Sequence, residues 1–431
     1  MKNKFKILTL LALSLFLGVS CEEKADQTLP EESQSESSQE ISQVSQDQDL
    51  ASSIDDYLSK SDNNLGKEST TESKAEDTKS IEENKEVKTA RLLFGGDILP
   101  HMPINDYAYN YGGGVYDYSR SFEDLKDFAE DYDFFMVNNE FTVNPNLEPS
   151  GFPQFNSNKE IYRALKDAGV DVMTTANNHS LDTGFEGLSS TIDLMNSYGI
   201  ENTGTSNTGE RSQLIYEVNG IKLGILSYAE ILNGFEYMLD TEEKAKMVNM
   251  LDPDQIEEDI RNIKDQVDFL VIYPHWGIEY SSYPEQYQID LAHDMIDWGA
   301  DLVIGNHPHV IQGMEEYESQ DGRDGIIYYS LGNLISNQKQ AAFEGDYRVE
   351  QGLLVEAEIE KSGNKKARLV NQSYHTTCVD RSYDEFGSLL KTFVATPYLE
   401  DEEKMGAIDP GTAWLIENAK EMNKATIDAG I

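Results

Sequence analysis

The sequence predicts an α/β fold with mixed β-sheets. Short apolar runs alternate with amphipathic segments of helical length along most of the chain, which is the pattern of strand–helix–strand units. Two pairs of strand-like runs are instead separated by short turn sequences, which indicates antiparallel hairpins. Parallel units combined with hairpins predict mixed sheets. With 431 residues, of which 39% are hydrophobic, the chain can bury a substantial core.

The composition alone excludes several classes of function and of site. The chain has 34 Lys and Arg residues against 79 Asp and Glu residues, a formal net charge of −45. Such a charge repels phosphate backbones, so we expect no nucleic-acid partner. The two cysteines, Cys21 and Cys378, cannot form a disulfide framework or a cysteine-based zinc site. We interpret Cys378 as a lone packed thiol.

Residues 1–20 have the features of a lipoprotein signal peptide. Basic residues near the start precede an apolar run over residues 7–17, which is too short for a permanent membrane helix of about 20 residues. The string Leu-Gly-Val-Ser-Cys at residues 17–21 resembles a bacterial lipobox, with Gly18 where Leu is more frequent, and makes Cys21 the predicted lipidation site. We expect an exported protein, lipid-anchored to the cell membrane and facing outside. A plain secretory signal and an uncleaved anchor are the alternatives.

Residues 21–89 are predicted to form a disordered acidic linker. The segment is rich in Ser, Gln, Glu and Asp, and Tyr57 is its one aromatic residue. Its low hydrophobicity and high charge cannot offset the entropy lost on ordering, so we expect a tether that holds a domain away from a membrane. A partner-binding segment is the alternative. We expect the globular domain over residues 90–380 and a helical extension over residues 381–431.

Strands and helices alternate along the predicted domain. Strands are expected at residues 91–97, 133–140, 170–179, 268–275, 301–307 and 326–333. Helices are expected at residues 121–132, 159–168, 185–198, 253–266 and 284–298. The hairpins are expected where residues 214–218 and 221–228 flank Asn219-Gly220, and where residues 352–360 and 367–374 flank residues 362–364.

Polar side chains gather at the carboxyl ends of these predicted strands. The set comprises Asp97, Glu140, Asn178, His179, His275, His307 and His309. It includes four of the seven histidines of the chain, at the edge where open α/β sheets bind ligands. Carboxylates, an amide and imidazoles suit Mn, Fe or Zn. Two such ions about 3.5–4 Å apart would clamp a phosphoryl or acyl group and generate hydroxide at neutral pH.

Each motif also has a structural interpretation when it is taken alone. Gly96-Asp97 is common in turns, and Asn-Asn-Glu at residues 138–140 is common as a cap. A buried His179 satisfied by Asp182 is a frequent core pair; in the functional interpretation Asp182 orients the ring for proton exchange. The segment 305–309 is the most specific, because two histidines that flank a proline bring their rings near one point.

Six strings occur in one order along the chain. They are Gly-Asp-Ile (96–98), Asn-Asn-Glu (138–140), Ala-Asn-Asn-His-Ser-Leu-Asp-Thr-Gly (176–184), His-Trp-Gly-Ile-Glu-Tyr (275–280), Gly-Asn-His-Pro-His-Val-Ile-Gln (305–312) and Tyr-Ser-Leu-Gly-Asn (329–333). Together they resemble the CapA family of poly-γ-glutamate capsule biosynthesis proteins, over about residues 91–333. That family is related to calcineurin-like metallophosphoesterases. The resemblance therefore implies a four-layer αββα sandwich with two mixed sheets and a two-metal site.

The resemblance also implies roles for single residues. The implied metal ligands are Asp97, Glu140, Asn178, His275, His307 and His309, with Glu140 in the bridging position. His179 would act beside the ions as an acid or hydrogen-bond donor. Two features depart from the phosphoesterase pattern: Leu99 stands where Asp-x-His requires histidine, and the second motif is Asn-x-Glu. A single ion, or a weak second site, is therefore the alternative to two ions; His101 is interpreted as a loop residue, or else as a substitute ligand.

Three functions remain open at this point. The leading hypothesis is a surface-anchored, metal-dependent hydrolase or transferase in the assembly or anchoring of an anionic extracellular polymer such as poly-γ-glutamate. The second is a non-catalytic capsule export or assembly subunit that works with other capsule-synthesis membrane proteins. The third is a general extracellular phosphodiesterase with a phosphoester substrate. The acidic surface would repel polyglutamate unless metal ions invert the field locally.

Overall fold

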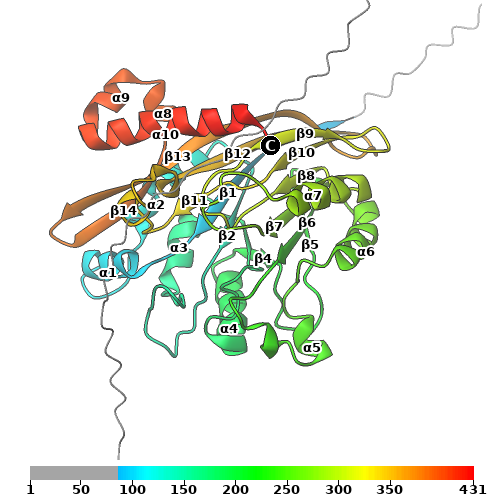
Figure 1. The fold of residues 1–431 in the computed structure, drawn as a ribbon, viewed down its shortest axis with the longest axis horizontal. Coiled ribbons are helices and arrows are strands. Elements are labelled where there is room, and N and C mark those ends of the chain that lie inside the picture. The colour runs from blue at the N-terminus through cyan, green and yellow to red at the C-terminus, as the bar shows by residue number, and fades with distance from the viewer. Residues whose placement is uncertain (1–85) are drawn as a thin grey trace, which may run out of the picture. The chain divides into compact units, whose positions relative to one another are not determined.

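The computed structural model describes residues 86–431 (Figure 1). The predicted signal peptide, the lipidation site Cys21 and nearly all of the acidic linker lie outside the described residues, so these assignments stay predictions. Within residues 86–431, none of the helices combines the length and the apolar character that crossing a bilayer requires.

The first sheet is mixed and is organised around β1. Strands β2, β3 and β4 continue it in parallel on one side, and β12, β13 and β14 form an antiparallel meander on the other. The short β11 (Asn333–Ile335) pairs in parallel with the end of β1, beyond the last residue that pairs with β12. In sheet order the other strands are β14 (Gly387–Val394), β13 (Arg368–Asp384), β12 (Gln351–Ser362), β1 (Val87–Ile98), β2 (Phe134–Asn139), β3 (Val172–Thr174) and β4 (Glu201–Thr203).

The second sheet is also mixed. In sheet order its strands are β5 (Leu214–Val218), β6 (Ile221–Ala229), β7 (Phe269–His275), β8 (Leu302–Ile304), β10 (Asp324–Tyr328) and β9 (Met314–Glu318). The four central strands are parallel, and each outer strand is antiparallel to its neighbour. Asn219 and Gly220 both have positive φ between β5 and β6, which confirms the hairpin predicted from this dipeptide.

Helices cover the outer face of each sheet, while the inner faces pack against each other. Successive residues of a strand point to opposite faces. Leu92 and Phe94 of β1 therefore join the inner core with residues of β6, β7 and β8, whereas Leu93 joins the outer core beneath the first helices. The covering helices are α1 (Met102–Tyr111), α2 (Ser119–Ala129) and α3 (Glu160–Asp167) on the first sheet, and α6 (Pro253–Ile263) and α7 (Gln286–Trp298) on the second. This layer order confirms the expected αββα sandwich with two mixed sheets (Figure 1).

The C-terminal part differs from the prediction. The expected boundary at residue 380 falls inside β13, and residues 381–394 complete the first sheet instead of forming helix. Gly387, with φ of 127°, lets the chain reverse tightly between β13 and β14. The helices begin only afterwards, as α8 (Thr396–Leu399), α9 (Glu402–Ala407) and α10 (Pro410–Ala429). Cys378 is fully buried among residues of this region, and burial raises the pKa of its thiol, as expected for a packed and unreactive cysteine.

Candidate metal centre

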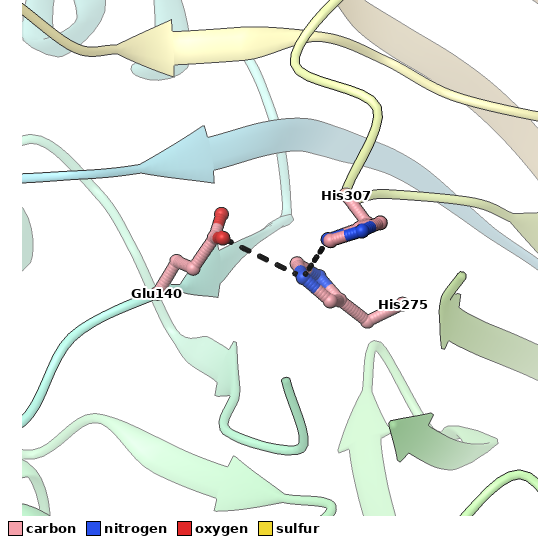
Figure 2. A group of neighbouring side chains, drawn as sticks. All are labelled: Glu140, His275 and His307. Carbon is pink, nitrogen blue, oxygen red and sulfur yellow. Dashed lines mark hydrogen bonds and ion pairs between the residues drawn. The ribbon is translucent and has the colours of Figure 1, made fainter. Parts of the chain in front are cut away.

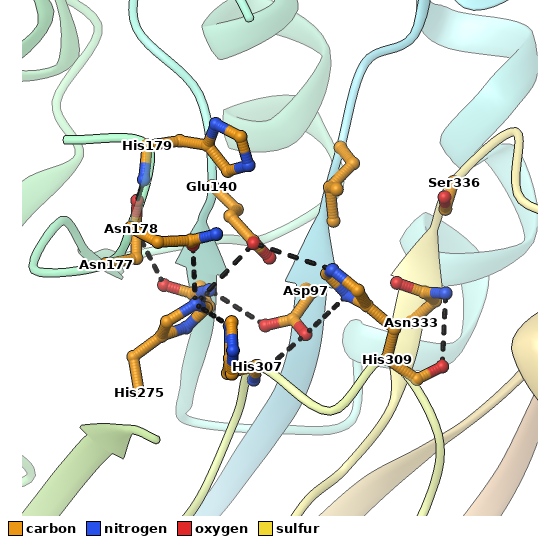
Figure 3. A network of polar contacts seen from close by, with 12 residues as sticks. Asp97, Glu140, Asn177, Asn178, His179, His275, His307, His309, Asn333 and Ser336 are labelled. Atoms are coloured by element: carbon orange, nitrogen blue, oxygen red, sulfur yellow. Dashed lines mark hydrogen bonds and ion pairs between the residues drawn. The ribbon is translucent and has the colours of Figure 1, made fainter. Parts of the chain in front are cut away.

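The six predicted ligands converge at the carboxyl edge of both sheets (Figure 3). The oxygen donors belong to the first sheet: Asp97 is in β1, Glu140 follows β2, and Asn178 follows β3. The imidazoles belong to the second sheet: His275 ends β7, and His307 and His309 follow β8. None of the six is more than 4% exposed. The site therefore forms only where the two sheets meet.

The backbone at the site allows unusually close approach between segments. The Asp97 N–H donates to the Gly332 carbonyl at 3.0 Å, and a Cβ on Gly96 would lie only 2.0 Å from that carbonyl oxygen. His307 and His309 have φ of 101° and 57°, in the left-handed region that non-glycine residues seldom adopt. Each such residue costs on the order of 1–3 kcal/mol, and such strain concentrates at functional sites.

One candidate ligand group is rich in nitrogen (Figure 2). Glu140, His275 and His307 place one ligand atom each within 4.8 Å of the others. The His275 Nε2 atom lies 3.1 Å from His307 Nδ1 and 3.5 Å from Glu140 Oε1. The Asn178 Oδ1 atom lies 2.9 Å from the same His275 Nε2, so the predicted amide ligand belongs to this group.

The other candidate group is richer in oxygen. Asp97, Glu140 and His309 also place one ligand atom each within 4.8 Å of the others. The His309 ring lies between the two carboxylates, with Nδ1 at 3.3 Å from Asp97 Oδ2 and Nε2 at 3.7 Å from Glu140 Oε1. Glu140 is common to both groups, which is the arrangement that a bridging carboxylate requires.

The donor set fits divalent cations. Glu140 is 0% exposed, and neither of its carboxylate oxygens has a hydrogen-bond partner within residues 86–431. Burying an unpaired carboxylate costs several kcal/mol or more unless a cation or a proton compensates it. Two carboxylates, an amide oxygen and three imidazoles form the mixed set that Mn, Fe and Zn accept.

The pKa shifts of the site residues also indicate that the buried carboxylates lack enough positive charge around them. Burial, reinforced by Asp97, raises the pKa of Glu140 well above its usual value. Burial lowers the pKa of His275 to about 3. Burial also acts to lower the pKa of His309, but the carboxylates of Glu140 and Asp97 outweigh it and raise that pKa to about 9. A raised pKa at Glu140 favours its uncharged carboxyl, and a protonated His309 compensates the charge of Asp97, whose own pKa His309 helps to lower. A divalent cation would displace these protons.

His179 lies beside the ligand set and is oriented as the sequence predicts (Figure 3). Its Nδ1 lies 2.7 Å from Asp182 Oδ2, which also accepts the Phe155 N–H at 2.6 Å. The Phe155 ring packs edge-on against the imidazole, with 4.8 Å between the ring centroids. Asp182 and Phe155 together fix the ring and leave Nε2 as the nitrogen available to a substrate.

His101 does not replace the histidine of the Asp-x-His pattern, whose position is occupied by Leu99. Leu99 is 2% exposed and belongs to the outer core of the first sheet. His101 precedes α1, where its Nδ1 lies 3.1 Å from the Leu99 carbonyl oxygen and 3.3 Å from the backbone nitrogen of Asn337. Neither candidate ligand group contains His101, in agreement with its interpretation as a loop residue.

Asn138 is a site residue that sequence reasoning did not assign. Its Nδ2 donates to Asp97 Oδ1 at 2.8 Å and lies 3.3 Å from His275 Nδ1, so the side chain connects the two halves of the site. Its Oδ1 accepts the Thr174 hydroxyl at 2.8 Å. The sequence feature that could have identified Asn138 is its position two residues before Glu140, because residues two apart in an extended segment point to the same face.

Comparison with known proteins gives concordant similarities. The profile of a family described as "Bacterial capsule synthesis protein PGA_cap" matches residues 91–338. The PGA biosynthesis protein CapA of Bacillus subtilis (strain 168) is 29% identical over 274 residues, which cover 61% of this chain and 64% of that protein. The capsule biosynthesis protein CapA of Bacillus anthracis is 32% identical over 211 residues, 48% of each chain. The chain thus spans about half to two thirds of the length of these relatives. The crystal structure of the calcineurin-like phosphoesterase YfkN from Bacillus subtilis matches with a TM-score of 0.38 and 13% identity, covering 68% of this chain and 91% of that one.

Proposed function

The chain belongs to the bacterial capsule synthesis protein PGA_cap family, and on that premise we propose that it is a metal-dependent hydrolase or transferase of an anionic extracellular polymer. Poly-γ-glutamate is the substrate that the resemblance to CapA proteins favours, and one relative is named a PGA biosynthesis protein. The proposal includes lipidation of Cys21, which would hold the domain at the outer face of the cell membrane on the linker of residues 21–89.

The observation that carries the proposal is the environment of Glu140. Both oxygens of this carboxylate are buried without a hydrogen bond within residues 86–431, and the carboxylate is shared by two candidate ligand groups, which favours a cation as its partner. A non-catalytic assembly subunit would have no need of such a group. Cation binding supplies the missing partner and accounts for the imidazoles around it.

The chemistry would be divided between the ions and two side chains of the protein. Divalent ions bound by the six ligands would polarise the scissile group and generate a nucleophile from water at neutral pH. His179 in its imidazolium form would protonate the leaving group from Nε2, while Asp182 accepts the Nδ1–H and holds the ring in place, so that the Nδ1–H tautomer remains after the transfer. The low exposure of both residues keeps bulk water away from this proton.

The substrate class follows from charge. The chain as a whole is strongly acidic, so a polyanion would be repelled except where cations are concentrated. Bound ions at the meeting edge of the two sheets would supply that local positive field and select an anionic group at the reacting position.

The test is turnover of two substrates by the purified full-length protein. Oligomers of γ-linked glutamate and a chromogenic phosphodiester are each incubated with and without Mn²⁺, and with the His179→Ala variant as the control. We expect Mn²⁺-dependent cleavage or transfer of the glutamate oligomer that the variant lacks. Turnover of the phosphodiester alone would reassign the protein as a phosphodiesterase. No turnover of either substrate by a metal-loaded protein would favour the non-catalytic subunit.

A further inference from the structure

We propose that Asn333 is a further metal ligand, which contributes its Oδ1 atom beside Asp97 and His309. In this assignment β11 supplies the donor that is lost because Leu99 occupies the position of the missing histidine. The inference rests on the metal-binding function proposed above and adds a seventh ligand to it.

The topology places Asn333 directly beside Asp97. The two residues are paired neighbours in the parallel contact between β1 and β11. After a shift of register between Asp97 and Ile98, the contact continues, and the Leu99 N–H donates to the Ile335 carbonyl at 2.9 Å. Leu99 itself turns into the apolar core, so β11 is the segment next to Asp97 at this point.

Hydrogen bonds determine which way the Asn333 amide points. Its Nδ2 lies near three oxygens: Gln338 Oε1 at 2.8 Å, the Val349 carbonyl at 2.9 Å and the His309 carbonyl at 3.2 Å. All three are acceptors, so this end of the side chain must be the NH₂ group. The amide orientation is therefore set by its surroundings and not by an arbitrary choice between N and O.

The other end of the amide has no partner. Asn333 is 0% exposed, and its Oδ1 atom lacks a hydrogen bond within residues 86–431, as do the Glu140 oxygens. Figure 3 shows the Asn333 oxygen on the side of the His309 ring and its nitrogen on the far side. The carboxylates of Asp97 and Glu140 are acceptors and cannot satisfy a buried carbonyl oxygen beside them, whereas a cation satisfies it.

The assignment makes the two ion positions chemically unequal. Asp97, Glu140 and Asn333 give one position three oxygen donors and a single imidazole, His309. The other position has two imidazoles, the shared Glu140 and the Asn178 amide. Oxygen-rich sets favour Mn²⁺ and Mg²⁺, and imidazole-rich sets favour Zn²⁺ and Fe²⁺. Asn333 would thus bias the first position toward Mn²⁺.

The competing explanation is that Asn333 only braces the His309 loop through its NH₂ group. Two substitutions separate the explanations. Asn333→Ala removes both the oxygen and the NH₂ group. Asn333→Asp also removes the NH₂ group but keeps an oxygen at the Oδ1 position and adds charge. Asn371→Ala, at an exposed position of β13, is the matched control.

The experiment measures Mn²⁺ binding by equilibrium dialysis and by low-temperature electron paramagnetic resonance, with melting in EDTA as a check of folding. We expect Asn333→Ala to lower the affinity for one of the two Mn²⁺ ions at least tenfold. The spectrum of a spin-coupled pair of Mn²⁺ ions should then disappear. We expect Asn333→Asp to retain both ions with wild-type or higher affinity. The control should match the wild type in both measurements.

Each result decides a distinct question. Equal losses in Asn333→Ala and Asn333→Asp would overturn the ligand assignment in favour of the bracing role. Two ions of wild-type affinity in Asn333→Ala would also overturn it, while leaving the proposed function intact. A wild-type protein that binds no Mn²⁺ would remove both proposals together.

Discussion

The two sheets contribute different chemistry to one site. The first sheet provides oxygen donors from the ends of β1, β2 and β3, whereas the second provides imidazoles from β7 and the loop after β8. Their inner faces share one apolar core, which fixes the edge where the donors meet. Neither sheet alone assembles a complete ligand set. Ion binding therefore depends on the packing of the two sheets against each other as well as on the identity of the ligands.

The difference between the donors of the two sheets explains why the site lacks positive charge without a cation. The first sheet brings two carboxylates into a buried position, and burial lowers the pKa of His275 and His307 on the facing sheet, so that His309 is the one facing imidazole whose pKa is raised. Divalent ions would join the two sheets and stabilise the folded state by about 2.7 kcal/mol at a concentration 100 times the dissociation constant.

The largest effect is expected at the residue that both ligand groups share. Glu140→Gln should abolish binding of both ions, and with them any metal-dependent turnover, a loss of about 10³-fold or more. The metal-free variant should melt close to the metal-free wild type, because burial raises the pKa of Glu140 and so favours the uncharged carboxyl, which glutamine resembles in shape.

A carboxylate buried elsewhere provides the control for Glu140. Asp259, in α6, accepts hydrogen bonds from Tyr228 in β6 and from Arg211 in the loop before β5. Asp259→Asn should lower the free energy of unfolding by about 1–3 kcal/mol while metal content stays at the wild-type level. If Glu140→Gln kept the metal content of the wild type and Asp259→Asn lost it, the Glu140 carboxylate would not be an ion ligand.

The next effect concerns the histidine that lies beside the ions. His179→Ala should keep the metal content of the wild type and lose 10²–10⁴-fold in turnover, the usual contribution of a general acid. Asp182→Asn should lose less, roughly 10–100-fold, because the imidazole remains but its tautomer is no longer fixed. Loss of metal from His179→Ala would instead make this histidine a ligand.

A smaller effect separates the contributions of the two sheets. His275→Ala should remove the ion of the imidazole-rich group and about half of the metal-induced rise in melting temperature. His293→Ala serves as the control, because that histidine pairs with Glu315 in the second sheet, away from the ligands. Identical metal contents in the two variants would contradict the two-group description.

The smallest effect on the site is expected from the anchor. Cys21→Ser should release the protein from the membrane fraction and change its mass, with no change in the metal content or turnover of the purified protein. Fractionation and mass identical to the wild type would contradict lipidation. The substitution also shows whether either sheet depends on attachment to a membrane.

Much of the site could be predicted because parallel strands end at a common edge. Asp97, Glu140 and His275 each follow an apolar run, so each could be placed at the carboxyl edge of an α/β sheet. That the edges of two sheets meet followed from the resemblance to a four-layer sandwich. The hairpin at Asn219-Gly220 was predictable because this dipeptide favours the positive φ values that the turn adopts.

Other features depend on contacts between distant segments that local patterns do not encode. The three-residue β11 pairs with β1 from more than 200 positions away, so the placement of Asn333 beside Asp97 followed only from the fold. The end of the first sheet was missed for a related reason. β13 continues past residue 380 because it pairs along its length with β12 and then β14, and not because of a stronger local propensity.

The central claim is that the meeting edge of the two sheets binds divalent ions. The most direct test is elemental analysis of the purified full-length protein, combined with melting curves in EDTA and in Mn²⁺ or Zn²⁺. We expect between one and two Mn, Fe or Zn ions per chain and a clear rise in melting temperature with added metal. A metal-free protein whose melting temperature is the same in EDTA, Mn²⁺ and Zn²⁺ would contradict it.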